Sequence, residues 1–237
     1  PRRTYATPNW DLDIVLKALC TAPYEPLAQA DFRALSKKTI FLVSLATAKR
    51  IGEMQAISVE VATMQEDMLL SYLHGFLPKT ARVDAPVARE FQLRALTPIV
   101  GAQDEERLLC PVRALKYYLR RTQDVAPRPR NLFVSVKNNK RPMSKNALSF
   151  FLRETIKHAH LTQPEATYPR GDVRAHSIRG VATSINFMQN RSFASVLEAA
   201  TWRGNNIFVS HYLKDVQRTF QHCSALGPIV AAGEVIP

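Results

Sequence analysis

Apolar residues recur every three or four positions along several segments of the chain, which is the spacing of helices with one buried face. The first such segment follows Pro8 and includes Leu12 and Leu19, and either Asn9 or Asp11 is suited to cap it. Further helices are predicted over residues 31–47, within 48–59, and over 111–122, 144–160, 175–189, 192–202 and 206–220.

Between residues 58 and 96 the pattern changes to short apolar runs (ISVEVATM, DMLLSYL and REFQLRAL) separated by polar or proline-containing turns. This pattern is typical of strands in a small antiparallel sheet. Residues 126–144 predict a loop, a short strand at LFVSV (132–136) and a basic, hairpin-like turn around Asn138 and Asn139. The sequence therefore predicts a mainly α fold with a small antiparallel β-sheet insert.

The net charge of the 237-residue chain limits the classes of partner that it is expected to bind. It has 32 Lys and Arg against 20 Asp and Glu, a formal net charge of +12, and most of the basic residues are Arg. Arg suits bidentate contact with phosphate, so a domain this basic favours a polyanionic partner. A membrane partner is disfavoured, because the sequence has no run of about 18 apolar residues and no basic amphipathic helix with a wide apolar face.

Several enzyme classes are disfavoured by missing motifs. The six histidines lack metal-site spacing such as HExxH, and no GxxxxGK[ST], GxGxxG or GxSxG motif occurs. The three cysteines are far apart, which favours a reducing compartment and argues against a disulfide framework or a zinc site. We therefore expect no metal and no cofactor.

With those enzyme classes disfavoured, the remaining candidate functional residues are mainly cationic side chains. His176 and Arg179 lie three residues apart in AHSIRG and share one face of a predicted helix. AKRIGE places Arg50 at the end of an apolar helix with Glu53 one turn later, where the two side chains can pair. GFLPKTAR puts Lys79 in a turn of the β insert. Each residue alone is more often structural, as a helix-end cation, a polar helix face or an exposed turn lysine.

Two aromatic residues complete this set. Trp202 follows an apolar helix and Tyr212 lies in the next one, where each by itself would be a core aromatic. The order Arg, Lys, HSIR, Trp, Tyr resembles the catalytic set of the tyrosine recombinases, the phage-integrase-like DNA strand transferases. PNWDLDIVLKAL, AKRIGEMQAIS, FLPKT, CPVRALKYYL, VRAHSIRGVATS and ATW…HYLKDV are similar to the eukaryotic mobile-element branch, which includes DIRS-like retrotransposons and Cryptons. The resemblance extends from about Trp10 to Val216.

The resemblance implies a catalytic-domain fold and a reaction. Tyrosine recombinases cut and rejoin DNA strands through a 3′-phosphotyrosyl intermediate without metal or ATP. The implied catalytic residues are Arg50, Lys79, His176, Arg179, Trp202 and Tyr212, with Glu53 in support. In this scheme the two arginines clamp the phosphate oxygens, Trp202 packs on the phosphate, and His176 assists proton transfer at the nucleophile. Tyr212 attacks, and Lys79 protonates the leaving 5′ oxygen.

Two features depart from the family pattern. Tyr212 follows Trp202 by ten residues, whereas a gap of nine is common and would fall on His211. We retain Tyr212, because a phenol is the required nucleophile. In addition, only about thirty residues precede the first catalytic helix, which are too few for the family's N-terminal core-binding domain. We expect that domain to be absent from this chain.

The expected organisation follows from these boundaries. Residues 1–30 form a linker and first helix, residues 31–220 the catalytic domain, and residues 221–237 a tail that is either exchanged between protomers or disordered. The family implies double-stranded DNA from element ends and target as the partner, a homo-oligomer forming a tetrameric synapse on DNA, and nuclear localisation. The expected contacts to the DNA backbone are Arg128, Arg130, Lys137, Lys140, Arg141 and Arg174.

Three other functions stay open at this point. The first is a domesticated or truncated recombinase fold that binds DNA without strand transfer, and the second is a topoisomerase that uses the same chemistry. The presence of every catalytic residue type favours the active enzyme over the first, and the mobile-element motifs do not favour the second. The last is a nonspecific RNA-binding module, for which neither an RNP-type aromatic strand nor a GXXG loop gives support.

Overall fold

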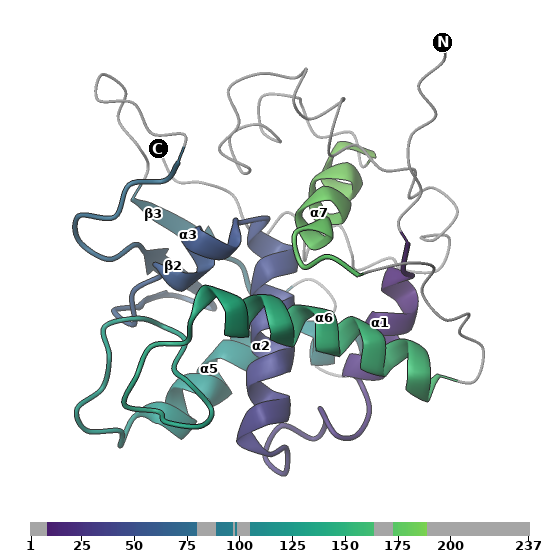
Figure 1. Ribbon diagram of the computed structural model, residues 1–237, viewed down its shortest axis with the longest axis horizontal. Helices are drawn as coiled ribbons and strands as arrows, with labels where there is room; N and C mark the ends of the chain where they lie inside the picture. Colours follow the sequence, from purple (N-terminus) through teal and green to yellow (C-terminus); the bar gives the residue numbers. More distant parts are fainter. Residues whose placement is uncertain (1–8, 80–88, 97, 99–104, 164–172, 189–237) are drawn as a thin grey trace.

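The chain folds around one long helix, α2 (Phe32–Thr47), which is buried along nearly its whole length. The structure is a computed structural model, and it describes residues 9–79, 89–96, 98, 105–163 and 173–188. Helix α2 lies at the centre and packs against α5 (Pro111–Thr122), α6 (Lys145–Thr162) and α7 (Ser177–Met188) (Figure 1). A helix with apolar residues on all sides must be covered on all sides, and these neighbours provide that cover.

The first helix, α1 (Leu12–Leu19), belongs to the same core and packs against α6. Of the two predicted caps, Asp11 is the one observed, since its side chain accepts a hydrogen bond from the Asp13 N–H at 2.9 Å. Trp10, which precedes the helix in the sequence, is buried, and its indole Nε1–H donates to Ser177 Oγ at 2.8 Å. The start of the described chain is thereby joined to the start of α7.

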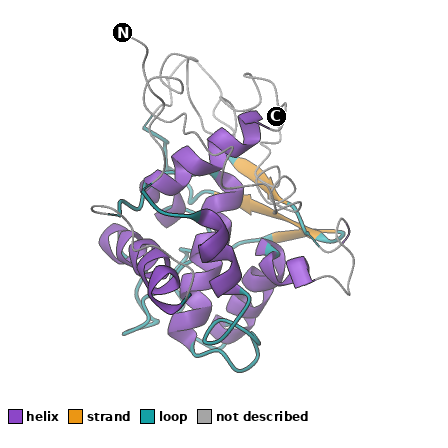
Figure 2. Cartoon of the chain, turned by 90° about the vertical axis from the view of Figure 1, so that its right-hand side faces the viewer, coloured by secondary structure: helices purple, strands orange, loops and turns teal. Residues whose placement is uncertain are grey.

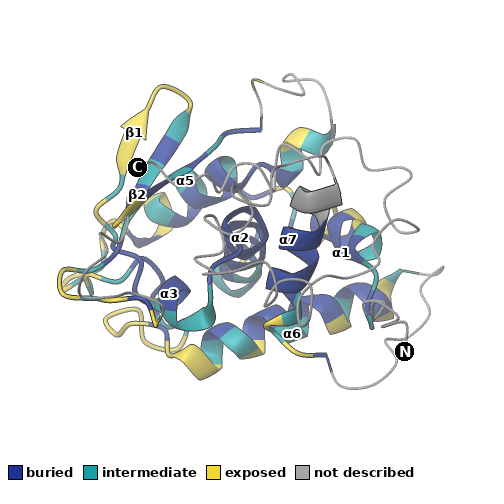
Figure 3. Cartoon of the chain, turned by 90° about the horizontal axis from the view of Figure 1, so that it is seen from above, coloured by how far each residue is buried: buried dark blue, intermediate teal, exposed yellow. Residues whose placement is uncertain are grey.

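The predicted β insert is confirmed as a three-stranded antiparallel sheet in the order β1 (Ala62–Met64), β2 (Asp67–Ser71) and β3 (Glu90–Leu93). It lies on one side of the helices (Figure 2). Strands β2 and β3 bury alternate side chains, whereas β1 is exposed along its length (Figure 3). The short helix α3 (Ile51–Gln55) precedes the sheet, and a 3₁₀ helix, η1 (Glu105–Leu109), which the sequence pattern did not predict, follows it.

The prediction of a strand at residues 132–136 is wrong. The backbone hydrogen bonds of these residues go to three different partners instead of one neighbouring strand: the Leu132 N–H donates to Ile57 O, the Val134 N–H to the Tyr118 hydroxyl, and Phe133 O accepts from the Met143 N–H. Only isolated bridges form in this segment, so no continuous ladder develops. The predicted turn that follows is confirmed by hydrogen bonds from the Arg141 N–H to Asn138 O and from the Ser135 N–H to Arg141 O.

The helices α2, α5 and α6 begin at residues that commonly start helices. Asp31 and Ser144 cap α2 and α6 through hydrogen bonds from the Ala34 and Ala147 N–H groups, and Pro111 occupies the first turn of α5. The predicted helices at 192–202 and 206–220 lie outside the described residues. None of the described helices is both long and apolar enough to cross a membrane.

A buried ion cluster fixes the turn after α1 against α2 and α5. Glu25 accepts two hydrogen bonds from the Arg113 guanidinium, at 2.6 and 3.0 Å, and pairs with the fully buried ammonium of Lys38. Burial raises the pKa of the Glu25 carboxyl, but the hydrogen bonds from Arg113 and Lys38 outweigh burial and hold the pKa below its usual value. The ionised carboxylate therefore stabilises the fold.

Glu25→Gln is expected to lower the free energy of unfolding at pH 7 by about 3 kcal/mol, because it leaves the Lys38 ammonium buried without its counter-ion. A carboxyl with a depressed pKa stabilises the fold above its unfolded-state pKa, and this stabilisation is lost as the pH falls through the folded-state value. The difference between variant and wild type in urea unfolding should therefore shrink in acid. Glu66→Gln, at an exposed position, is the control. A constant difference between pH 3 and pH 7 would contradict this account.

Candidate active site

The chain leaves α2 through a residue in the left-handed conformation. Ala48 has a φ of 50°, and its N–H donates to Ser44 O at 3.0 Å. A residue with a Cβ costs about 1 kcal/mol in this conformation, and the close packing around Ala48 holds it there. The left-handed turn ends α2 and places Lys49 and Arg50 between two helices, with Arg50 as the N-cap residue of α3.

The carboxylate of Glu53 joins the two arginines that the sequence singled out. It accepts from the Arg50 backbone N–H at 2.7 Å and from Arg50 Nη1 at 3.0 Å, so the predicted pairing of these residues is present. Arg179 Nη1 lies 3.6 Å from Glu53 Oε2, the oxygen that also accepts from the Arg50 backbone N–H. Glu53 and Arg179 are almost fully buried, and Arg50 is partly exposed. One buried anion thus holds two guanidinium groups from distant parts of the chain.

Helix α7 supplies Arg179, and the residues just before it supply His176. The start of this helix is fixed by the hydrogen bond from Trp10 to the Ser177 hydroxyl, which in turn donates to Arg174 O at 2.6 Å. His176 is exposed, whereas Arg179 points inward to Glu53. The HxxR spacing therefore places one member at the surface and the other in the interior.

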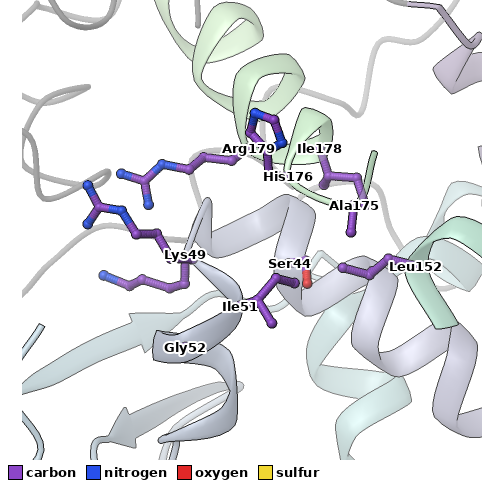
Figure 4. A pocket seen from close by; sticks show the side chains of 10 residues that line it. Ser44, Lys49, Ile51, Gly52, Leu152, Ala175, His176, Ile178 and Arg179 are labelled. Atoms are coloured by element: carbon purple, nitrogen blue, oxygen red, sulfur yellow. The ribbon is translucent and has the colours of Figure 1, made fainter. Parts of the chain in front are cut away.

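These side chains meet at a cavity of about 370 Å³ between the end of α2, α3, α6 and the start of α7. It is lined by Ser44, Lys49, Arg50, Ile51, Gly52, Leu152, Ala175, His176, Ile178 and Arg179 (Figure 4). One wall is apolar and the other is cationic. A cavity of this size with fixed guanidinium donors is suited to a small anionic group such as a phosphate.

Lys49 is a cavity residue that the sequence analysis missed. The residue is 5% exposed, and its side chain extends to the same side as that of Arg179 (Figure 4). Burial lowers the pKa of its ammonium to about 8, while Glu53 opposes this shift and Arg179 and Arg50 reinforce it. The available signal was a lysine directly beside Arg50 at the end of an apolar helix, a position that is normally exposed.

The other predicted catalytic residues are not brought into this group. Lys79 is exposed at the end of a described segment and is not one of the residues that line the cavity. Trp202 and Tyr212 lie outside the described residues. The roles of all three stay predictions.

The predicted DNA contacts have different environments. Arg130, Arg174 and the residues of the basic turn, Lys137, Lys140 and Arg141, are exposed. Arg128 is half-buried, and its Nη2 donates to Leu132 O at 3.3 Å, so this guanidinium already supports the loop that follows it. Its proposed contact with DNA stays a prediction. In the residues that the structure describes, no three His, Cys, Asp or Glu side chains gather as a metal site would require.

No family model matches this sequence, and no curated protein matches it either. The structure, however, is similar to solved structures. XerH site-specific recombinase bound to palindromic difH substrate, in a post-cleavage complex, matches with a TM-score of 0.56 and 14% identity over 90% of this chain and 51% of that chain. XerA recombinase matches with a TM-score of 0.53 and 16% identity over 97% of this chain and 65% of that chain.

A pre-cleavage complex of XerH with difH substrate matches with a TM-score of 0.57 and 12% identity over 92% of this chain and 53% of that chain. This chain has the fold of a tyrosine recombinase catalytic domain. The predicted fold class is therefore confirmed. The chain spans between 51% and 65% of the length of these recombinase chains.

Glu53→Gln is expected to lower the free energy of unfolding by about 3 kcal/mol, because two guanidinium groups then lack their shared counter-ion. Added sulfate should stabilise the variant more than the wild type, since an external anion can replace the lost charge. Urea unfolding with and without sulfate measures both effects. Glu60→Gln, at an exposed position in the same region, is the matched control. Wild-type stability in Glu53→Gln would show that this carboxylate does not organise the arginines.

Proposed function

We propose that this chain is the catalytic domain of a tyrosine-type, site-specific DNA recombinase, which cuts and rejoins DNA strands through a covalent 3′-phosphotyrosyl intermediate. The observation that carries the proposal is the meeting of Arg50 and Arg179 on the Glu53 carboxylate beside a cavity, within a tyrosine recombinase fold. Two of the similar XerH structures are complexes with difH substrate before and after cleavage, which supports DNA as the substrate here.

The arginine pair suits the electrostatics of phosphodiester exchange. Attack on a phosphodiester gives a pentavalent phosphorus whose non-bridging oxygens gain negative charge. Guanidinium groups that a buried carboxylate already holds in place can accept this charge without reorganising. Arg50 and Arg179 would clamp these oxygens, with His176 at the exposed side of the same cavity assisting proton transfer at the nucleophile.

The remaining steps rest on residues assigned by resemblance. The phenolic oxygen of Tyr212 forms a bond to phosphorus as the bond from phosphorus to the 5′ oxygen breaks. Lys79 gives a proton to the departing 5′ oxygen, and the indole N–H of Trp202 hydrogen-bonds the phosphate. The phosphotyrosyl ester keeps the energy of the broken diester, so the attack of a 5′ hydroxyl on it rejoins the strands without ATP.

The biological setting belongs to the same proposal. The motifs similar to DIRS-like retrotransposons and Cryptons favour a eukaryotic mobile element, action in the nucleus, and a tetrameric synapse on element ends and target. The exposed cations of the turn at residues 137–141, together with Arg130 and Arg174, would contact the DNA backbone.

Tyr212→Phe is expected to abolish covalent attachment to a nicked suicide DNA from the element ends, because the variant lacks the attacking oxygen. Salt-sensitive DNA binding should be nearly unchanged. A denaturing gel detects the protein–DNA adduct, and peptide mass spectrometry maps the modified residue. If this variant forms as much protein–DNA adduct as the wild type, Tyr212 is not the nucleophile.

Tyr72→Phe is the matched control for this experiment. Tyr72 is buried near Glu53 and the two arginines, and burial strongly raises the pKa of its phenol, so it is a poor nucleophile. The adduct should persist in Tyr72→Phe. DNA binding by the wild type without any adduct would instead favour the alternative of a recombinase fold that binds DNA without strand transfer.

Lys79→Ala is expected to slow cleavage of ordinary DNA by at least about a hundredfold, the contribution typical of a general acid. A substrate with sulfur in place of the bridging 5′ oxygen should restore the rate, since a thiolate leaves without a proton. Single-turnover cleavage of the two substrates measures this rescue. A lack of rescue would argue that Lys79 is not the acid.

A further inference from the structure

The ammonium of Lys49 occupies an unusual place beside the arginine pair. The residue is 5% exposed and lines the cavity. Its Nζ lies 4.7 Å from the centre of the Phe91 ring in β3 and 6.0 Å from the centre of the Tyr72 ring. Aromatic faces attract a cation but do not replace the hydrogen bonds that an ammonium makes with water.

In the described part of the chain, the Lys49 ammonium has no hydrogen-bond or ion-pair partner. Glu53 attracts it electrostatically, but the two oxygens of that carboxylate already engage Arg50 and Arg179. A buried ammonium is costly unless an anion or acceptor satisfies it. The position therefore suits a group that enters the cavity from outside and brings oxygens with it.

The charges around the cavity indicate what that group is. Lys49, Arg50 and Arg179 contribute three positive charges, and Glu53 contributes one negative charge. The cluster therefore has an excess of two positive charges. A phosphodiester carries one negative charge, which offsets part of this excess, and two non-bridging oxygens that can accept from the donors. An ammonium can donate to an oxygen whose other lone pairs are held by guanidinium groups, because its three N–H bonds point in different directions.

We propose that Lys49 is a further phosphate-binding residue of this site, whose ammonium donates to the DNA phosphodiester beside Arg50 and Arg179. This inference rests on the proposed function for the identity of the phosphodiester. The role differs from that of Lys79, which is exposed and does not line the cavity.

A pH dependence follows from this role. The charged and titratable groups that face the Lys49 ammonium or share its cavity are Glu53, Arg50, Arg179, Tyr72 and His176. In the free protein the pKa of Lys49 is lowered to about 8. A bound phosphodiester favours the charged form and raises this pKa, so binding takes up a proton above about pH 8 and becomes weaker as the pH rises.

The direct test is an NMR titration of the wild-type chain with ¹³C-labelled lysine ε-carbons, in which Lys49→Met assigns the Lys49 signal. The titration is repeated with suicide DNA bound to Tyr212→Phe, which holds the substrate uncut. We expect the Lys49 midpoint near pH 8 without DNA and at a clearly higher pH with it. An unchanged midpoint would overturn the inference.

Variants give a second, independent measurement. Lys49→Met should weaken DNA binding about tenfold at pH 7, the range of a charge-assisted hydrogen bond, and should remove the weakening of wild-type binding above pH 8. Lys49→Arg should restore most of the affinity and also lack the pH dependence. Lys157→Met, at an exposed position of α6, is the control for a general loss of positive charge. Wild-type affinity and pH dependence in Lys49→Met would overturn the inference.

The two proposals fail in different ways. Covalent attachment at Tyr212 with an unchanged Lys49 titration would remove Lys49 from the phosphate site and leave the recombinase function intact. If DNA raises the titration midpoint of Lys49 but no covalent adduct forms, the result would support the phosphate site and argue against strand transfer. Urea unfolding of Lys49→Met separates both from misfolding, because replacing a buried ammonium by an apolar chain of similar length should not destabilise the fold.

Discussion

One buried carboxylate holds the candidate active site together. Glu53 binds Arg50 through both its backbone and its guanidinium, and it also engages Arg179 from a helix more than a hundred residues away in the sequence. Without this anion the two cations would repel each other in a region of low dielectric constant. The ion group therefore sets the relative positions of α3 and α7, and those positions define the cavity. Stability and site geometry here depend on the same interaction.

The packing of α2 determines where that carboxylate and its cations lie. The helix is buried on all sides and ends abruptly at the left-handed residue Ala48, so the chain turns before the helix can reach solvent. Lys49 consequently stays in the interior, against the ring of Phe91 in the sheet. The β insert thus supplies an aromatic ring, that of Phe91, which packs against the Lys49 ammonium.

Features that depend on local spacing were predictable from the sequence, and those that depend on long-range packing were not. Helix caps and the pairing of Arg50 with Glu53 follow from residues three apart in the chain. The burial of Lys49 depends on a sheet residue far along the chain, which no local pattern reveals. The LFVSV segment has the apolar composition of a strand, but its hydrogen bonds are divided among several partners. The roles of Trp202 and Tyr212 rest on resemblance alone.

The hydrogen bond from Trp10 to Ser177 joins positions 167 residues apart. A contact with such a large sequence separation carries a high entropic cost, because a long loop must be closed to form it. A nascent chain that ends before α7 therefore carries Arg50 and Glu53 but lacks Arg179 and the anchor that orients it. The complete cationic site exists only after both ends of the described fold have docked. Fragments that lack α7 therefore hold only part of the cationic cavity, and the assembly of this cavity is coupled to the docking of the two ends of the described fold.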